Sequence, residues 1–178
     1  MLPKQPTHYE SVQKELEAVR LRFFRLLNEI KESDWDRRLP GEGWTIKQEM
    51  THIVQVFRVL PKGIQRANCG GGRSILAFAP TGLRSWINGY IVIPLMARNA
   101  TRQSISEDYN KAHTHMLALL KGLPEEAWSK SAPYPRKVRT IEQLARRPVE
   151  HFEEHEAHLR KALLIQTAMA AKTSQRTR

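Results

Sequence analysis

Three histidines lie within eight residues in the stretch RPVEHFEEHEAHLRKAL. His151 and His155 are four residues apart, and His158 follows three residues later. Residues four apart on a helix lie one above the other on the same face, so two imidazoles at this spacing can reach one divalent metal ion. The chemistry that this pattern suggests is therefore metal binding by paired histidines from a single helix.

Buried histidines also have an ordinary explanation, because a neutral imidazole inside a core can be satisfied by a hydrogen bond. Two of them on one apolar face are harder to explain in this way, since each needs its own polar partner. The spacing alone leaves metal binding and hydrogen-bonded core histidines equally open. A complete metal site also needs a third ligand from another part of the chain.

A helix that begins at Thr140 is expected to position the histidine pair. Thr140 and Gln143 have the spacing of a capping box, in which each side chain bonds the other's backbone N–H. On a helical wheel His155 falls on the buried face and His151 lies one turn earlier, whereas His158 points to the side. Pro148 is expected to bend this helix just before His151, because proline cannot donate the usual backbone hydrogen bond.

Three further amphipathic helices are predicted from apolar residues that recur every three or four positions. The first runs from about Tyr9 to Glu32, and the second begins at Thr45 and is kinked or ended by Pro61. The third runs from about Ser104 to Lys121, with Ser104 and Glu107 as its capping box. Four helices joined by short to medium loops predict an all-α four-helix bundle.

The segment between the second and third helices, from about Asn68 to Ala100, is an irregular apolar insertion. Its prolines and glycines favour one or two short helices over the bundle, with a strand at Tyr90 to Ile93 as the alternative. It could serve as a subunit interface or as a lid over a pocket. Residues 1–167 are expected to form a single domain, and residues 168–178 a basic, disordered tail.

Two other histidines lie on or beside the apolar faces of the predicted helices, His52 on the second and His113 on the third. Helical bundles build metal sites in their cores from side chains on facing helices. Two imidazoles from the last helix and one from a neighbour would leave a coordination position open, as in catalytic zinc sites. His113 is compatible with a pocket wall, with a group supporting the ligands and, as the simplest interpretation, with an ordinary buried residue.

Composition limits the function classes. The chain has a net charge of +11 and a pI of about 10.2, so its charge does not exclude nucleic-acid binding. Its basic residues are scattered, however, and no recognition motif accompanies them, so nucleic-acid binding is not favoured. The single cysteine permits neither an intrachain disulfide nor a multi-cysteine zinc site, which suits the cytoplasm. The longest apolar run, Ile87 to Ala97, is far shorter than the roughly 20 residues of a membrane helix.

Three stretches together resemble the DinB-like superfamily. GWTIKQEMTHIVQVF, Gly43 to Phe57, is similar to its second-helix signature, a Trp followed by Thr or Ser and later by a His. The stretch from Ser106 to Trp128 resembles the third helix and its exit loop. His151 to Leu159 resembles the closing pattern of His, three residues, His, two residues, His and an aliphatic residue. Their order and spacing carry the resemblance, since no one of them is specific alone.

The resemblance implies a divalent metal of the zinc, nickel or iron class, held by His52, His151 and His155, with His113 and His158 as candidate pocket or supporting residues. It also implies a thiol-dependent S-transferase or isomerase that uses bacillithiol, mycothiol or glutathione, or a hydrolase. In either case a metal-bound thiol or water would act on a small-molecule substrate, and the protein would be a homodimer. The alternatives are a non-catalytic metal- or ligand-binding stress-response protein and a basic nucleic-acid-associated protein.

Overall fold

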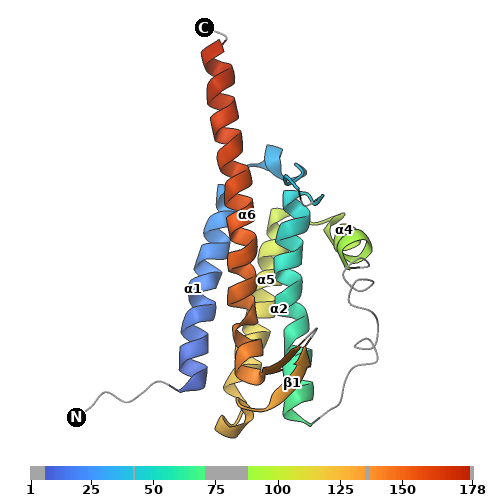
Figure 1. Cartoon of the computed structure of the whole chain (residues 1–178), viewed down its shortest axis with the longest axis vertical. Helices are drawn as coiled ribbons and strands as arrows, with labels where there is room; N and C mark the ends of the chain where they lie inside the picture. The colour runs from blue at the N-terminus through green and yellow to red at the C-terminus, as the bar shows by residue number, and fades with distance from the viewer. Residues whose placement is uncertain (1–6, 42, 71–87, 135–136, 177–178) are drawn as a thin grey trace, which may run out of the picture.

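The computed structural model describes residues 7–41, 43–70, 88–134 and 137–176 of the chain (Figure 1). Four long helices run side by side and confirm the predicted all-α four-helix bundle. They are α1 (His8–Glu29), α2 (Ile46–Asn68), α5 (Arg102–Lys121) and α6 (Ile141–Arg176). None of the helices in this described part of the chain is long and apolar enough to cross a membrane.

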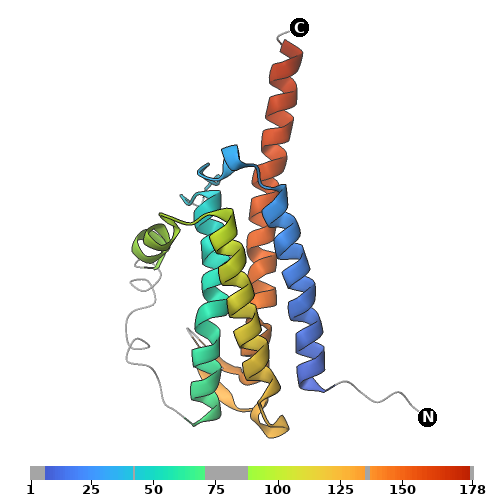
Figure 2. The same cartoon turned by 180° about the vertical axis from the view of Figure 1, so that it is seen from behind.

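The helix α2 packs against both α5 and α6, and α1 packs against the same two helices, so the four enclose one apolar core (Figures 1 and 2). Aromatic rings fill its centre. The rings of Phe23 and Tyr109 are stacked with centroids 4.0 Å apart, and Phe57 and Phe152 lie against them. This core sets α2 alongside α6, which are the two helices with the histidines of interest.

Side-chain caps fix where these helices begin. The capping boxes predicted at Thr45 and Thr140 are both present, the first with Gln48 and the second with Gln143. The box predicted at Ser104 is wrong, because α5 begins two residues earlier and Thr101 pairs with Ser104 instead. At the end of α1 the helix stops at Glu29, three residues before the predicted end.

Both helix-interior prolines are accommodated. Pro61 does not end α2, which continues to Asn68, and α6 passes through Pro148 and continues to Arg176. Its C-terminal part extends beyond the other helices (Figure 1). The backbone is thus helical over most of the segment that was predicted to be a disordered tail, while the division of the chain at residue 167 stays a prediction.

The insertion between α2 and α5 is described only from residue 88 onward, so its first part lies outside the described residues. A π-helix, η3 (Asn88–Val92), leads into the short helix α4 (Ile93–Ala97), which packs against α2. The alternative of a strand at Tyr90 to Ile93 is therefore wrong, and short helices were the better expectation. Ile93 and Ala97 are buried, which holds this segment on the bundle.

A small hairpin precedes α6 where a loop was expected. It follows the short helix η4 (Glu125–Ala127) and pairs β1 (Ser131–Tyr134) with β2 (Lys137–Thr140) in antiparallel register. Ile141 donates its backbone N–H to Lys130, so the hairpin leads directly into the first turn of α6. Another short helix, η1 (Glu32–Asp34), lies between α1 and α2.

Candidate metal centre

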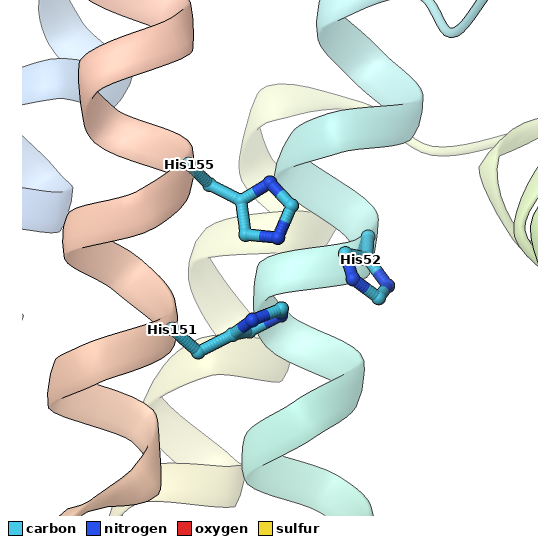
Figure 3. Close-up of side chains that lie close together, drawn as sticks. All are labelled: His52, His151 and His155. Atoms are coloured by element: carbon cyan, nitrogen blue, oxygen red, sulfur yellow. The ribbon is translucent and has the colours of Figure 1, made fainter. Parts of the chain in front are cut away.

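Three histidines from two helices meet beside the core (Figure 3). His52 comes from α2, and His151 and His155 from successive turns of α6. Their ring centroids are 4.7 Å apart for His52 and His151, 4.9 Å for His52 and His155, and 4.3 Å for His151 and His155. One ligand atom of each residue lies within 4.8 Å of those of the other two, so together they can hold a metal ion.

The local structure explains why the rings converge. His52 lies in the second turn of α2, and the cap at Thr45 fixes the first turn. Pro148 leaves the carbonyl of Leu144 without its usual N–H partner, but α6 continues and keeps His151 buried against α2. The bend that the sequence predicted before His151 therefore does not prevent the three rings from meeting.

Unpaired ring nitrogens test whether these residues fit a metal. His52 Nδ1 and His151 Nε2 are both buried and have no hydrogen-bond partner among the residues that the structure describes. A buried polar atom without a partner costs roughly 1–3 kcal/mol, so two such atoms side by side are unusual in an apolar core. Nitrogens around a tetrahedral zinc ion are about 3.3 Å apart, and the ligand atoms here lie within 4.8 Å of one another, so only a small approach of the rings would be needed. The donor set fits a divalent cation of the imidazole-binding class.

Burial also sets the charge of these imidazoles. The pKa of His52 is lowered to about 4, first by burial and then by the neighbouring His155. The pKa of His151 falls to about 3, chiefly through burial and then through the adjacent His155 and His52. Both rings are therefore neutral at pH 7, and a neutral imidazole is the form that binds metal.

A buried carboxylate that the sequence analysis missed contacts the third histidine. Glu49 is on α2 and fully buried, and its Oε1 is 2.5 Å from His155 Nδ1. The available signal was its position three residues before His52, which places both on one side of α2. In a sequence, an acidic residue in the first turn of a helix is already explained by the helix dipole, so this signal was not used.

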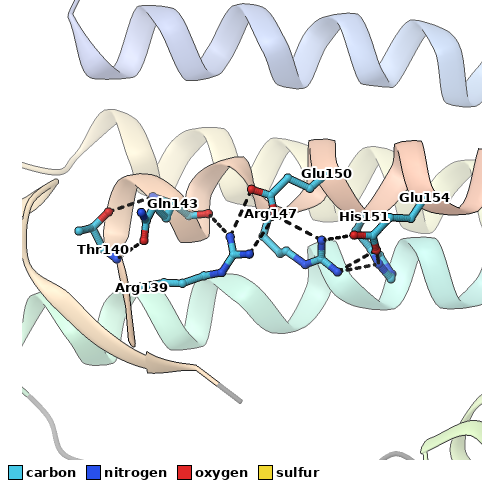
Figure 4. Close-up of polar contacts among 7 residues, drawn as sticks. All are labelled: Arg139, Thr140, Gln143, Arg147, Glu150, His151 and Glu154. Atoms are coloured by element: carbon cyan, nitrogen blue, oxygen red, sulfur yellow. Dashed lines mark hydrogen bonds and ion pairs between the residues drawn. The ribbon is translucent and has the colours of Figure 1, made fainter. Parts of the chain in front are cut away.

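A chain of ion pairs reaches His151 from the hairpin (Figure 4). Arg139 of β2 binds Glu150, which also contacts Arg147 of α6. Arg147 in turn binds Glu154 at 3.0 Å, and both lie near His151 Nδ1, at 3.5 and 3.6 Å respectively. Three glutamates, Glu153, Glu154 and Glu156, are interleaved with the histidines in the sequence. Glu154 is the one that lies beside His151.

Trp44 forms a wall beside His52. Its ring packs edge-on against the imidazole with centroids 4.9 Å apart, and its Nε1 donates to the carbonyl of Gly89 at 3.0 Å. A Cβ at Gly89 would lie 3.4 Å from the Trp44 ring, so a larger residue would crowd this contact. Trp44 thus connects the insertion, through its hydrogen bond to Gly89, with the three-histidine cluster, through its contact with His52.

The two remaining candidate residues lie outside the three-ring cluster. His158 is half exposed, and its Nδ1 is 4.0 Å from Glu49 Oε1. His113 is buried on α5, where Phe57 and Tyr109 flank its ring and Glu17 is 3.8 Å from its Nε2. It also lines a groove of about 350 Å³ between α1 and α5. Burial lowers the pKa of His113, so its imidazole is mainly neutral. Its neighbours are Phe57, Tyr109 and Glu17 rather than the three clustered histidines.

Comparison with known proteins agrees with this architecture. The DinB superfamily pattern matches residues 15–159, so the chain belongs to the DinB superfamily. The crystal structure of an uncharacterized protein from Clostridium difficile 630 is similar, with a TM-score of 0.70 and 13% identity over 89% of this chain and 96% of that chain. A crystal structure of a Streptococcus pneumoniae protein has a TM-score of 0.65 and 14% identity over 90% of this chain and 92% of that chain.

The mycothiol-dependent maleylpyruvate isomerase is also similar in structure. Its TM-score is 0.67 at 13% identity, over 87% of this chain and 63% of the isomerase. The chain therefore spans less than two thirds of the isomerase's length. At these identities the similarity shows a shared fold. No curated protein matches the chain.

Proposed function

We propose that this protein is a metal-dependent enzyme that holds a divalent cation through His52, His151 and His155. It would use a low-molecular-weight thiol in one of two ways: it transfers the thiol to a small molecule, or it isomerises a small molecule with the help of the thiol. The observation that carries the proposal is the meeting of three largely buried imidazoles, two of which have a buried ring nitrogen without a hydrogen-bond partner. Membership of the DinB superfamily and the shared fold with a mycothiol-dependent isomerase support the choice of a thiol.

The chain's own residues suit this role. Three imidazole ligands leave at least one coordination position for a ligand from solution, as in catalytic rather than structural zinc sites. A bound cation would lower the pKa of a thiol or water at that position and so supply a nucleophile near neutral pH. Trp44 limits access to His52 from one side, and the ion pair of Arg147 and Glu154 lies beside His151.

The donor set defines a class of metals. Neutral imidazole binds zinc, nickel and iron alike. The affinities of a protein site for the divalent first-row metals follow nearly the same order from one site to another, so the ligands alone do not select one metal. Zinc suits the proposal best because three imidazoles and an open position give it a tetrahedral site without redox chemistry.

Cobalt substitution tests the thiol directly. The protein is loaded with Co²⁺ and titrated with glutathione, mycothiol and bacillithiol, while the near-ultraviolet absorption is recorded. At least one thiol is expected to give a sulfur-to-cobalt charge-transfer band, which His52→Ala abolishes. If Co²⁺ binds but no thiol gives the band, the thiol-dependent proposal is contradicted. The hydrolase alternative, in which water occupies the open position, would then be favoured.

The proposal includes a homodimer, which the family resemblance implies, in the cytoplasm, which the single cysteine suits. Three large apolar side chains on η3 and α4 are exposed and offer a surface for pairing: Tyr90, Ile91 and Leu95. Light scattering coupled to size exclusion measures the mass of the particle, and a mass of twice 20.6 kDa is expected. A mass of one chain at micromolar concentration would contradict the dimer without affecting the metal site.

A further inference from the structure

We propose that Glu49 is a positioning residue, which fixes His155 in the tautomer and orientation that metal binding requires. The inference rests on the proposed metal site and adds a fourth residue to it. Glu49 would not itself bind the cation. Its carboxylate would act through the imidazole that it contacts.

The burial of Glu49 is the first reason. Its side chain is fully buried, and its Oε2 has no hydrogen-bond partner within the described part of the chain. Taking a carboxylate out of water costs several kcal/mol, which a single close contact offsets only in part. An apolar residue at this position would suit the core better. A buried acid kept at such a cost is more simply explained by what it does to His155 than by stability.

The contact geometry supplies the second reason. A carboxylate can only accept, so the hydrogen bond of 2.5 Å between Glu49 Oε1 and His155 Nδ1 requires a proton on Nδ1. A neutral imidazole has only one such proton, and the lone pair is then on Nε2. The Nε2 side of the ring faces His52 and His151 (Figure 3). Glu49 therefore selects the tautomer whose lone pair points to the centre of the cluster.

The other two histidines lack an equivalent support. His151 Nδ1 has Arg147 at 3.5 Å and Glu154 at 3.6 Å, both at or beyond the limit of a hydrogen bond. The buried Nδ1 of His52 has no hydrogen-bond partner in residues 7–41, 43–70, 88–134 and 137–176. His155 is thus the one ring of the cluster held by a short contact to a fully buried group. We infer that Glu49 fixes the His155 ring in place, and that the rings of His52 and His151 move to complete the site around a bound cation.

A second cation between Glu49, His155 and His158 is the competing explanation, because their ligand atoms also lie within 4.8 Å of one another. The separation of 2.5 Å between Glu49 Oε1 and His155 Nδ1 favours the hydrogen bond. Two ligands of one cation stand about 3 Å or more apart, given metal–ligand distances of roughly 2.0–2.2 Å. His158 is also half exposed and 4.0 Å from Glu49, which is far for a pre-formed ligand.

Three variants separate positioning from a general effect on the fold. Glu49→Gln keeps an acceptor of nearly the same shape but removes the charge, and Glu49→Ala removes both. Glu156→Gln is the matched control, because Glu156 is buried on α6 and is ion-paired with Arg22 and Arg160. It lies next to His155 in sequence, but its carboxylate pairs with these arginines.

Two measurements are made on each variant. Competition with a chromophoric chelator gives the Zn²⁺ affinity, and long-range ¹H–¹⁵N NMR correlations of the metal-free protein give the tautomer of His155. Glu49→Ala is expected to weaken Zn²⁺ binding by about 10–100-fold and to leave His155 as a mixture of tautomers. Glu49→Gln is expected to keep the Nδ1–H tautomer and lose less affinity, while Glu156→Gln matches the wild type in both.

The tautomer is measured without metal, so it tests Glu49 even if the proposed metal site fails. An unchanged tautomer in Glu49→Ala would overturn the inference, as would an unchanged Zn²⁺ affinity. Two bound ions per chain that fall to one in His158→Ala would also overturn it, in favour of the second cation. Absence of Zn²⁺ binding in the wild type, with the Nδ1–H tautomer present, would contradict the proposed function and leave the Glu49–His155 contact as a structural one.

Discussion

At the scale of single residues, the cluster joins three imidazoles whose surroundings differ. His155 contacts a buried carboxylate, His151 lies beside an arginine–glutamate pair, and His52 is packed against Trp44. Burial keeps His52 and His151 neutral well below pH 7. A site of this kind is prepared to bind a cation without first releasing protons from those two rings.

The lowered pKa values predict how the stability of the metal-free protein depends on pH. In the unfolded chain both rings take up protons near pH 6.5, whereas in the folded protein they do so near pH 4 for His52 and pH 3 for His151. The unfolded state therefore binds more protons between these values, and the free energy of unfolding falls as the pH drops below about 6.5. Urea denaturation with a chelator present, from pH 7 to pH 5, measures this fall.

Each ring contributes at most about 1.4 kcal/mol per pH unit within that window. His52→Ala is the control, because it removes one of the two rings and is expected to reduce the slope accordingly. If the wild type and this variant have the same slope between pH 7 and pH 5, the assigned pKa of His52 is wrong.

The residues of the site differ in how far sequence could reveal them. The pairing of His151 and His155 follows from their spacing of four on a helix. His52 was selected by the resemblance of its stretch to a family signature, since no local pattern relates it to a helix 99 residues away. Glu49 was missed because its partner is on another helix, and a carboxylate in a first helical turn has a sufficient local explanation.

At the scale of elements, α2 is the helix on which the site depends most. It contributes both His52 and Glu49, within two turns of its N-terminus, and packs along α6. The Thr45 hydroxyl accepts the backbone N–H of Gln48, and the Gln48 side chain accepts the backbone N–H of Thr45. The cap should therefore affect the site as well as the stability of the helix.

Thr45→Ala is expected to lower the free energy of unfolding by about 1 kcal/mol and to weaken metal binding several-fold, because fraying of the first turn disturbs Glu49 and then His52. Thr101→Ala is the matched control, since it removes the corresponding cap from α5, which contributes no ligand. It is expected to cost similar stability and to leave metal affinity unchanged. Urea denaturation and chelator competition measure the two quantities, and equal loss of affinity in both variants would contradict the argument.

The helices were predictable and the connections between them were not. Apolar residues at steps of three and four gave all four bundle helices, because each helix buries one face against its neighbours. The hairpin before α6 was read as a loop since Pro133 lies within β1 and proline is rare in strands. Tyr90 to Ile93 has the β-branched composition of a strand, but burial of Ile93 against the bundle stabilises a helical turn instead.

At the scale of the whole molecule, the net charge of +11 is the feature that the site does not explain. Several arginines are already paired within the fold, among them Arg22, Arg146 and Arg160. Their acidic partners are already counted in that net charge, and the basic residues as a whole are scattered along the sequence without a recognition motif. We therefore expect only weak, non-specific attraction to DNA.

Fluorescence anisotropy with a labelled duplex tests this expectation. The dissociation constant is expected to be weaker than about 1 µM at physiological salt and to rise steeply as salt is added, as for non-specific binding. The metal-site variant His52→Ala should bind DNA in the same way as the wild type. A dissociation constant in the nanomolar range at physiological salt would instead support the basic nucleic-acid-associated alternative.

The metal content of the protein tests the central claim most directly. The protein is purified without a polyhistidine tag, dialysed, and analysed for bound divalent metals by mass spectrometry. The account predicts close to one equivalent per chain in the wild type and in His113→Ala, whose imidazole lies on α5 outside the cluster, and a marked loss in His52→Ala and His155→Ala. Less than about a tenth of an equivalent in the wild type, unchanged in those two variants, would contradict it.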